Sequence, residues 1–148
     1  MNFEITYSLI NLSIMPVWIL LIFAPSWKWT DKIAQTALIP LLFGIVYAFF
    51  VGWGMVFEAP ILGAGMGSLK AVMLLFDSPI STLAGWTHYL VFDLFVGMWI
   101  VRDGRQNGIG ALWRAPCLAL TFMFGSIGLA LYLLILWIRK GKVSLLNS

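Results

Sequence analysis

Hydrophobic residues are concentrated in four long stretches of the chain, and polar residues lie mainly between them. Three of these stretches contain no Asp, Glu, Lys, Arg or His, whereas the third in chain order contains His88 and Asp93. A helix that crosses a membrane needs about 20 mainly apolar residues. The pattern therefore predicts an all-α, polytopic membrane protein, a bundle of four transmembrane helices at residues 5–27, 33–57, 79–101 and 115–138.

The composition supports this prediction, because 61% of the 148 residues are hydrophobic and only 10% are charged. A soluble domain has roughly 25% charged residues. The four spans use nearly the whole chain, which predicts a single domain over residues 1–148. The net charge of +3 comes from basic residues that flank the spans. Such residues act as membrane anchors, so nucleic acid is not an expected partner.

The segment at residues 58–78 is less uniformly apolar than the spans. Gly63, Gly65 and Gly67 stand at alternate positions in it, and a mainly apolar segment, residues 69–76, follows. Glycine permits backbone conformations that other residues avoid. We therefore expect a flexible loop that leads to a short interfacial or re-entrant helix and can close over a site as a lid.

Two of the predicted spans carry small side chains at helical spacing, which allow neighbouring helices to approach closely in a membrane. These positions are Gly44, Ala48 and Gly52 in the second span, and Thr121, Gly125, Ser126 and Gly128 in the fourth.

Four spans leave the orientation undecided. The first and third loops hold five basic residues, and the second loop and the tail hold four: Lys28, Lys32, Arg102, Arg105 and Arg114 against Lys70, Arg139, Lys140 and Lys142. Orientation follows an excess of Lys and Arg on one side, and five against four is no excess.

His88 and Asp93 are the candidates for chemistry, because an ionisable side chain inside a span costs at least ~2.5 kcal/mol on insertion scales and normally faces a partner, a cavity or a ligand. On one helix the two side chains are about 140° apart around the axis and about 7.5 Å apart along it. Each therefore needs a partner from another element. Candidates by residue type are Asn11, Ser13, Glu58 and Thr121.

Two interpretations of this pair stay open. In the first, Asp93 is kept protonated by its apolar surroundings and acts as a general acid, with His88 as the base. Aromatic residues on the same span would then line the pocket: Trp86, Tyr89, Phe92, Phe95 and Trp99. In the second, the polar residues only hold helices together and the aromatic residues form core or lipid contacts.

Other chemistries are excluded by the residue inventory. One cysteine, Cys117, excludes an intramolecular disulfide, and one histidine with one cysteine excludes a multi-ligand metal site of those residue types. We expect no metal and no cofactor, and we expect Cys117 to be a small buried residue.

The third span also resembles a known family. The run LAGWTHYLVFDLFVGMWIVRD from Leu83 to Asp103, with Gly108-Ile109 and the segment from Pro116 to Gly128, is similar to the abscisic-acid-deficient-type (neoxanthin synthase-like) membrane proteins. Residues of the first span fit the same pattern: Asn11, Pro16, Trp18, Pro25, Trp27 and Thr30. The family includes a plant plastid protein required for neoxanthin synthesis.

The resemblance implies an isomerase acting on a carotenoid or related isoprenoid. In the plant reaction a 5,6-epoxide opens and an allene forms without a change of formula, which requires an acid and a base but no net redox step. Asp93 and His88 would fill these roles, and Arg102 or Asp103 would contact a ring hydroxyl. The chain has no Ser- and Arg-rich transit peptide, so a bacterial member in the inner membrane is expected.

A second function class is a non-catalytic subunit that binds a carotenoid, a retinoid or a lipid. Pigment analysis separates the two classes, because an isomerase changes the pigment whereas a binding subunit co-purifies with it unchanged. The expected partners are the lipid bilayer, a carotenoid, retinoid or other polyene, and a second copy of the chain in a homo-oligomer.

Overall fold

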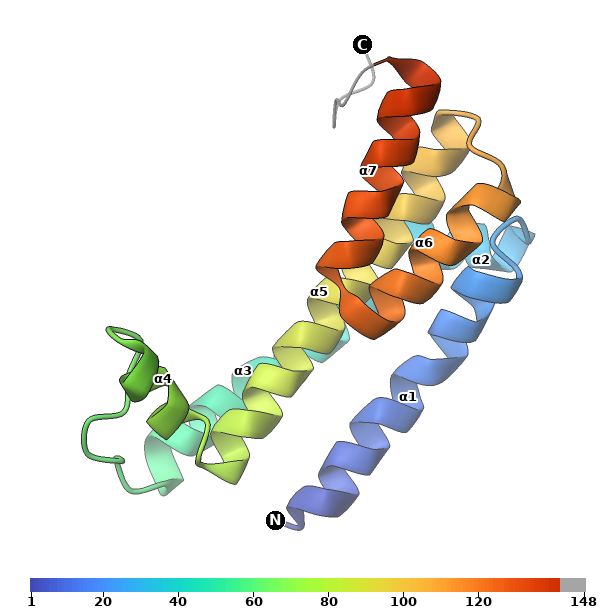
Figure 1. Ribbon diagram of the computed structural model, residues 1–148. Helices are drawn as coiled ribbons and strands as arrows, with labels where there is room; N and C mark the ends of the chain where they lie inside the picture. The colour runs from blue at the N-terminus through green and yellow to red at the C-terminus, as the bar shows by residue number, and fades with distance from the viewer. Residues whose placement is uncertain (142–148) are drawn as a thin grey trace. The chain divides into compact units, whose positions relative to one another are not determined.

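The computed structural model describes residues 1–141, and the regular secondary structure in this part of the chain is all helical (Figure 1). Its seven helices are α1 (Phe3–Phe23), α2 (Lys28–Gln35), α3 (Leu38–Phe57), α4 (Leu69–Leu75), α5 (Pro79–Gln106), α6 (Ala111–Phe124) and α7 (Ser126–Lys140). The all-α class predicted from the sequence is confirmed.

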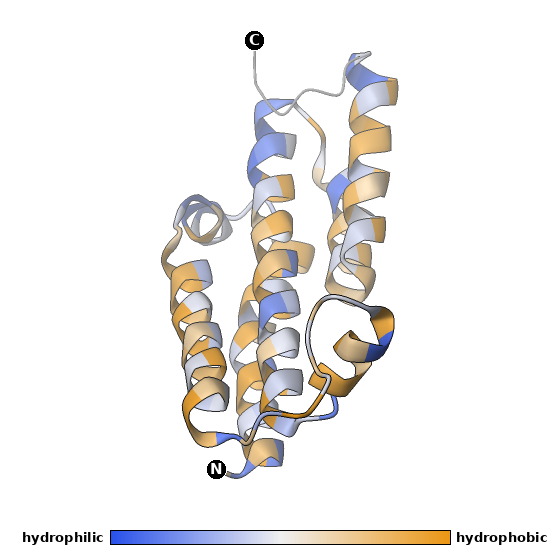
Figure 2. Cartoon of the chain, turned by 90° about the vertical axis from the view of Figure 1, so that its left-hand side faces the viewer, coloured by the Kyte–Doolittle hydropathy of each residue, from blue (hydrophilic) through white to orange (hydrophobic). Residues whose placement is uncertain are grey.

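Within the described residues, α1, α3 and α5 are long and apolar enough to cross a membrane. They correspond to the first three predicted spans, and Figure 2 shows mainly hydrophobic residues along α3, whereas hydrophobic and hydrophilic residues alternate along α5. Their ends differ from the prediction: α1 stops at Phe23, α3 starts at Leu38, and α5 continues to Gln106. With 28 residues, α5 is about 42 Å long, longer than the hydrocarbon core.

The fourth predicted span is not one helix, and this part of the prediction is corrected. Residues 115–138 are divided at Gly125, where φ is +51° and ψ is −94°, a conformation that suits glycine. α6 has 14 residues and α7 has 15, so each is only about 21–22 Å long. Neither alone matches a hydrocarbon core of about 30 Å, and a bundle of four spanning helices is not confirmed.

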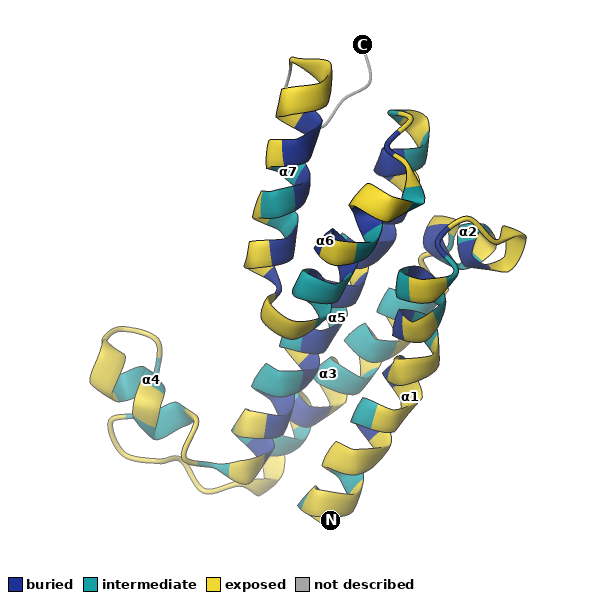
Figure 3. Ribbon diagram, turned by 45° about the vertical axis from the view of Figure 1, so that its right-hand side comes forward, coloured by how far each residue is buried: buried dark blue, intermediate teal, exposed yellow. Residues whose placement is uncertain are grey.

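α6 and α7 form an antiparallel hairpin (Figure 1). Near its closed end, Gly128 of α7 packs on the backbone of Thr121 and Cys117 of α6. Near its open end, the Arg139 guanidinium lies 4.5 Å from the centre of the Trp113 ring. One side of α7 is buried by this packing and the other is exposed, as Figure 3 shows.

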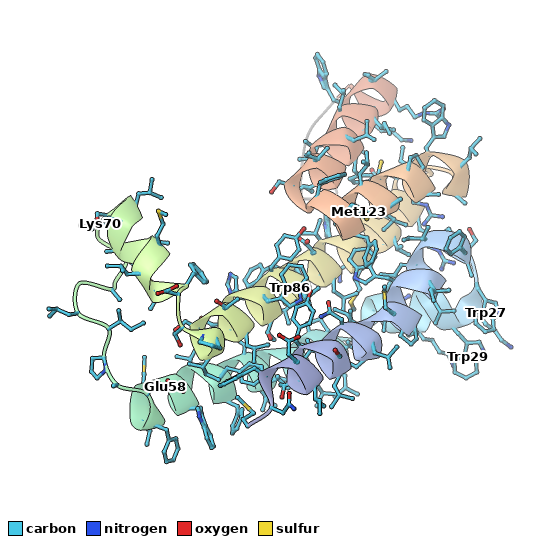
Figure 4. All side chains as sticks on the ribbon, turned by 60° about the horizontal axis from the view of Figure 1, so that its bottom comes forward. Trp27, Trp29, Glu58, Lys70, Trp86 and Met123 are labelled. Carbon is cyan, nitrogen blue, oxygen red and sulfur yellow. The ribbon has the colours of Figure 1, made fainter. Side chains whose placement is uncertain are left out.

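The short helix α2 occupies the polar segment between the first two predicted spans. Its buried face carries Thr30 and Ala34, and the Thr30 hydroxyl donates to the carbonyl of Leu20 at 3.5 Å. Trp27 and Trp29 are exposed, and Figure 4 shows both side chains at the outer side of this helix. α2 is therefore amphipathic, which is typical of a helix that lies at a membrane interface.

The short helix predicted after the glycine-rich loop is confirmed as α4. Ser68 is its N-cap residue, and the Ser68 hydroxyl accepts a hydrogen bond from the Ala71 amide at 3.2 Å. In the preceding loop, Gly63 has φ +83°, and the Gly65 amide donates to the Ala71 carbonyl at 3.1 Å. The loop is thus tied to α4 by its own backbone. Its role as a lid stays a prediction.

The helices form two compact units. The first unit contains residues 1–14 and 38–91, and the second contains residues 15–37 and the chain from Phe92 onward. In the first unit, the Phe76 ring packs against Gly85. In the second, Trp18 packs against Gly97, where an added Cβ would lie 2.8 Å from the indole.

The close packing predicted for Gly44 and Gly52 is not found, because no heavy atom lies within 4 Å of the Cβ that either would carry. Two small residues of the predicted fourth span, Thr121 and Gly128, are in close contact, although they join two helices of one hairpin.

Candidate functional site at the helix hairpin

Asp93 lies at the tip of the α6–α7 hairpin, within the second unit. Its side chain is buried, with 9% of the residue surface exposed. The carboxyl group packs on Gly125, so closely that a Cβ there would be 2.5 Å from Oδ1 and 3.1 Å from Oδ2. The carboxyl group predicted to matter is therefore held where the chain turns from α6 into α7.

Gly125 makes this contact possible for two reasons. It has no side chain, and it adopts the positive φ that ends α6 and begins α7. Its amide donates to the Thr121 carbonyl at 2.8 Å, and its carbonyl accepts from the Gly128 amide at 3.1 Å. A helix N-terminus carries partial positive charge, so a carboxylate beside the start of α7 is electrostatically favourable.

A second buried carboxyl group, Asp103, is engaged by the protein itself. The Tyr132 hydroxyl of α7 donates to Asp103 Oδ2, and Asn107 Nδ2 donates to the same oxygen at 3.1 Å. Trp99 meets the Tyr132 ring edge-on, with ring centres 5.3 Å apart. Asp103 is only 4% exposed and connects α5 to α7. Its predicted contact with a ring hydroxyl stays a prediction.

Arg114, at the start of α6, is also buried. It passes over Gly104 of α5, where any side chain would overlap its Cδ. Its Nη1 donates to the Val101 carbonyl at 2.9 Å and its Nη2 to Ser26 at 3.4 Å, whereas its Nε has no protein partner. Burial lowers the pKa of Arg114, and the charge of Arg105 lowers it further. These contacts hold α6 against the end of α5.

Trp99 and Arg102, both predicted to bind substrate, lie at one small depression of about 70 Å³ in the second unit. Its other lining residues are Ala34, Gln35, Thr36, Ala37, Phe95 and Met98. Arg102 is exposed. Three residues further along α5, Arg105 forms an ion pair with Asp31 of α2. A cavity of this size accommodates a group of a few atoms and not a whole polyene.

In the first unit, three of the predicted binding residues form one cluster. Trp86 Nε1 donates to Asn11 Oδ1 at 3.1 Å, and Asn11 Nδ2 donates to the Tyr7 carbonyl at 2.8 Å. The Trp86 ring stacks on Tyr89, with centres 5.5 Å apart, and also contacts Tyr7. Asn11 is thus a partner of Trp86.

His88 is exposed on α5, and its ring lies 5.4 Å from the Tyr47 ring of α3. Glu58 is exposed where α3 ends, and Figure 4 shows it well away from Trp86. Phe92 is 56% exposed. The Thr121 hydroxyl is buried and donates to the Cys117 carbonyl at 2.8 Å.

Three residues at the hairpin were absent from the predicted site: Gly125, Arg114 and Tyr132. A signal for two of them was available, because Arg114, Cys117, Thr121 and Gly125 recur at three- and four-residue steps and so share a helix face. The predicted spans leave Arg114 in the third loop, whereas the structure places it in α6. Cys117 is buried, as predicted. In residues 1–141, no group of three His, Cys, Asp or Glu side chains could hold a metal ion.

The fold and this site define a helical membrane protein with a carboxyl group buried at a break between two helices. A family model described as ABA DEFICIENT 4-like matches residues 5–132, and the chain belongs to this family. The family predicted from the third span is therefore confirmed.

Protein ABA DEFICIENT 4, chloroplastic, from Arabidopsis thaliana is 23% identical over 104 residues. The match covers 66% of this chain and 46% of the plant protein, so it spans less than half of that relative. No solved structure matches the chain.

Proposed function

We propose that this protein is a membrane isomerase that rearranges a carotenoid or related polyene isoprenoid. Membership of the ABA DEFICIENT 4-like family supports the substrate class, given the link between this family and neoxanthin synthesis. The observation that carries the proposal is the buried Asp93 carboxyl group at the hairpin tip. A bacterial inner membrane stays the predicted location.

The chemistry asked of Asp93 is a proton transfer. The carboxyl group gives its proton to an epoxide oxygen as one C–O bond breaks, which leaves a hydroxyl group. A base removes a proton from a polyene carbon, so the formula does not change. The carboxylate that remains on Asp93 lies beside the N-terminus of α7, where negative charge is stabilised. His88, five residues earlier on α5, is the predicted base.

A second candidate function is a non-catalytic subunit that binds a polyene. One observation favours it: the Asp93 carboxyl group packs on Gly125, so it already has a structural task in holding the hairpin. In that case its burial needs no catalytic explanation.

Expression in a host that produces violaxanthin separates the two functions. The wild-type protein should change the pigment profile, and Asp93→Asn should lower conversion by ~10² or more while pigment still co-purifies, because an amide cannot supply an acidic proton. Asp77→Asn, at an exposed carboxyl group, is the matched control. Conversion by Asp93→Asn at the wild-type rate would show that Asp93 is structural. Pigment bound but unchanged by the wild-type protein would establish the binding subunit.

A further inference from the structure

The basic residues of the second unit gather at the end where α5 stops. Lys28 and Lys32 are on α2, which is tied to this end by the pair Asp31–Arg105. Arg102 lies in the penultimate turn of α5. Arg139 and Lys140 close α7, and the Arg139–Trp113 contact places them beside the start of α6.

With a hairpin in place of a fourth span, the Lys and Arg residues are distributed differently between the two sides of the membrane. With four spans, the tail would lie opposite the loop that joins α5 to α6. Because α6 and α7 are antiparallel, the C-terminal end of α7 returns to the side from which α6 starts. Among the described residues, Lys70 is then the only Lys or Arg on the opposite side, against seven on this one: Lys28, Lys32, Arg102, Arg105, Arg114, Arg139 and Lys140.

The length of the hairpin is that of a segment that enters the membrane from one side and does not cross it. Its tip meets Asp93, which is 13 residues before Gln106, or about 20 Å along α5. α6 has nearly the same length, about 21 Å. Irregular backbone at such a depth requires cover by protein, and Asp93 covers the turn at Gly125.

We propose that α6 and α7 form a re-entrant hairpin that enters from the side where α5 ends, and that the basic residues of this side contact anionic phospholipid headgroups of the cytoplasmic leaflet. Three spans then place the end of α1 that carries Glu4 outside and the end of α7 inside. The charge difference satisfies the rule that Lys and Arg remain on the cytoplasmic side. This inference is independent of the proposed isomerase activity.

Labelling of single cysteines in the full-length protein tests the arrangement. Met66→Cys reports the loop between α3 and α4, Gln106→Cys the end of α5, and Lys140→Cys the end of α7; all three positions are exposed. The wild-type chain is the control, because its single cysteine, Cys117, is buried. A membrane-impermeant maleimide is added to intact cells, to permeabilised cells and to protein denatured in SDS. The SDS sample gives the signal for complete labelling of each cysteine.

We expect Met66→Cys to be labelled in intact cells, and Gln106→Cys and Lys140→Cys only after permeabilisation. Labelling of Gln106→Cys and Lys140→Cys from opposite sides would mean that the hairpin region crosses the membrane, and would overturn the proposal. Labelling of both from outside would overturn the assignment to the cytoplasmic leaflet. Neither result depends on pigment conversion, so failure here is distinct from failure of the proposed activity.

Discussion

Asp93 and Gly125 depend on each other at the scale of single residues. The carboxyl group occupies the space that a side chain at position 125 would fill. The positive φ of Gly125 would be strained in any residue with a Cβ. Gly125 thus provides the backbone conformation of the turn and precedes the first residue of α7. It also contacts Asp93, the only buried carboxyl group at the hairpin tip among the described residues.

We expect Gly125→Ala to lower the free energy of unfolding by about 1–3 kcal/mol, the usual cost of an unfavourable backbone conformation plus displacement of the Asp93 carboxyl group. Thermal unfolding in detergent measures it. In the double variant Asp93→Ala/Gly125→Ala, the second change should cost less than in the wild type, because the overlap is gone and only the φ strain remains. Equal costs in both backgrounds would show that the two residues are not coupled.

At the scale of elements, the hairpin is held by close backbone contact. Gly128 lies so near the Thr121 amide and the Cys117 carbonyl that a side chain would overlap backbone atoms, which cannot rotate away. The open end is held by the Arg139–Trp113 stack, and α5 is attached through Tyr132 and Asp103. Two short helices can therefore form a stable unit although neither is long enough to span a membrane.

Gly128→Ala should separate α6 from α7 and cost about 3 kcal/mol, the upper part of the range for overpacking, because the obstructing atoms are backbone. Gly44→Ala on α3 is the matched control, since nothing lies within 4 Å of its added methyl group. Its stability should be unchanged or slightly higher. Thermal unfolding of both variants in the same detergent decides the point, and equal melting temperatures would contradict the close contact.

At the scale of the whole molecule, charge is divided unevenly between the two units. Among described residues, the first unit carries Glu4, Glu58, Lys70 and Asp77, whereas the second carries seven basic side chains against three acidic ones: Asp31, Asp93 and Asp103. The exposed indoles of Trp27 and Trp29 accompany the lysines of α2. Aromatic and basic side chains together are typical of the headgroup region.

An anionic lipid should therefore stabilise the protein through α2. In nanodiscs, replacing part of the phosphatidylcholine by phosphatidylglycerol should raise the melting temperature. In the variant Lys28→Gln/Lys32→Gln, the increase in melting temperature should be smaller. The lost stabilisation corresponds to about 2 kcal/mol, at about 1 kcal/mol per lysine. High salt should reduce the gain in the wild-type protein, because it screens surface charge. Lys70→Gln is the control, and an equal loss in that variant would contradict a preferred basic side.

Several features followed from the local pattern of residues. Long apolar runs are sufficient to form α1, α3 and α5, because a helix satisfies its own backbone without help from neighbours. The mainly apolar segment at residues 69–76 after a glycine-rich loop predicted α4 correctly. The run around Asp93 was specific enough to predict the family. Asp93 itself was predicted from the cost of placing a carboxyl group in a span, and it is buried.

The hairpin was decided only by tertiary structure. Residues 115–138 are as apolar as a span, and hydropathy does not distinguish one long helix from two short ones. The difference lies in contacts between residues distant in sequence: Asp93 on Gly125, Tyr132 on Asp103, and Arg114 over Gly104. The sequence by itself determined which segments are helical and apolar, because those properties are local. Where the chain turns back, and on which side its charges gather, depends on which surfaces meet after folding.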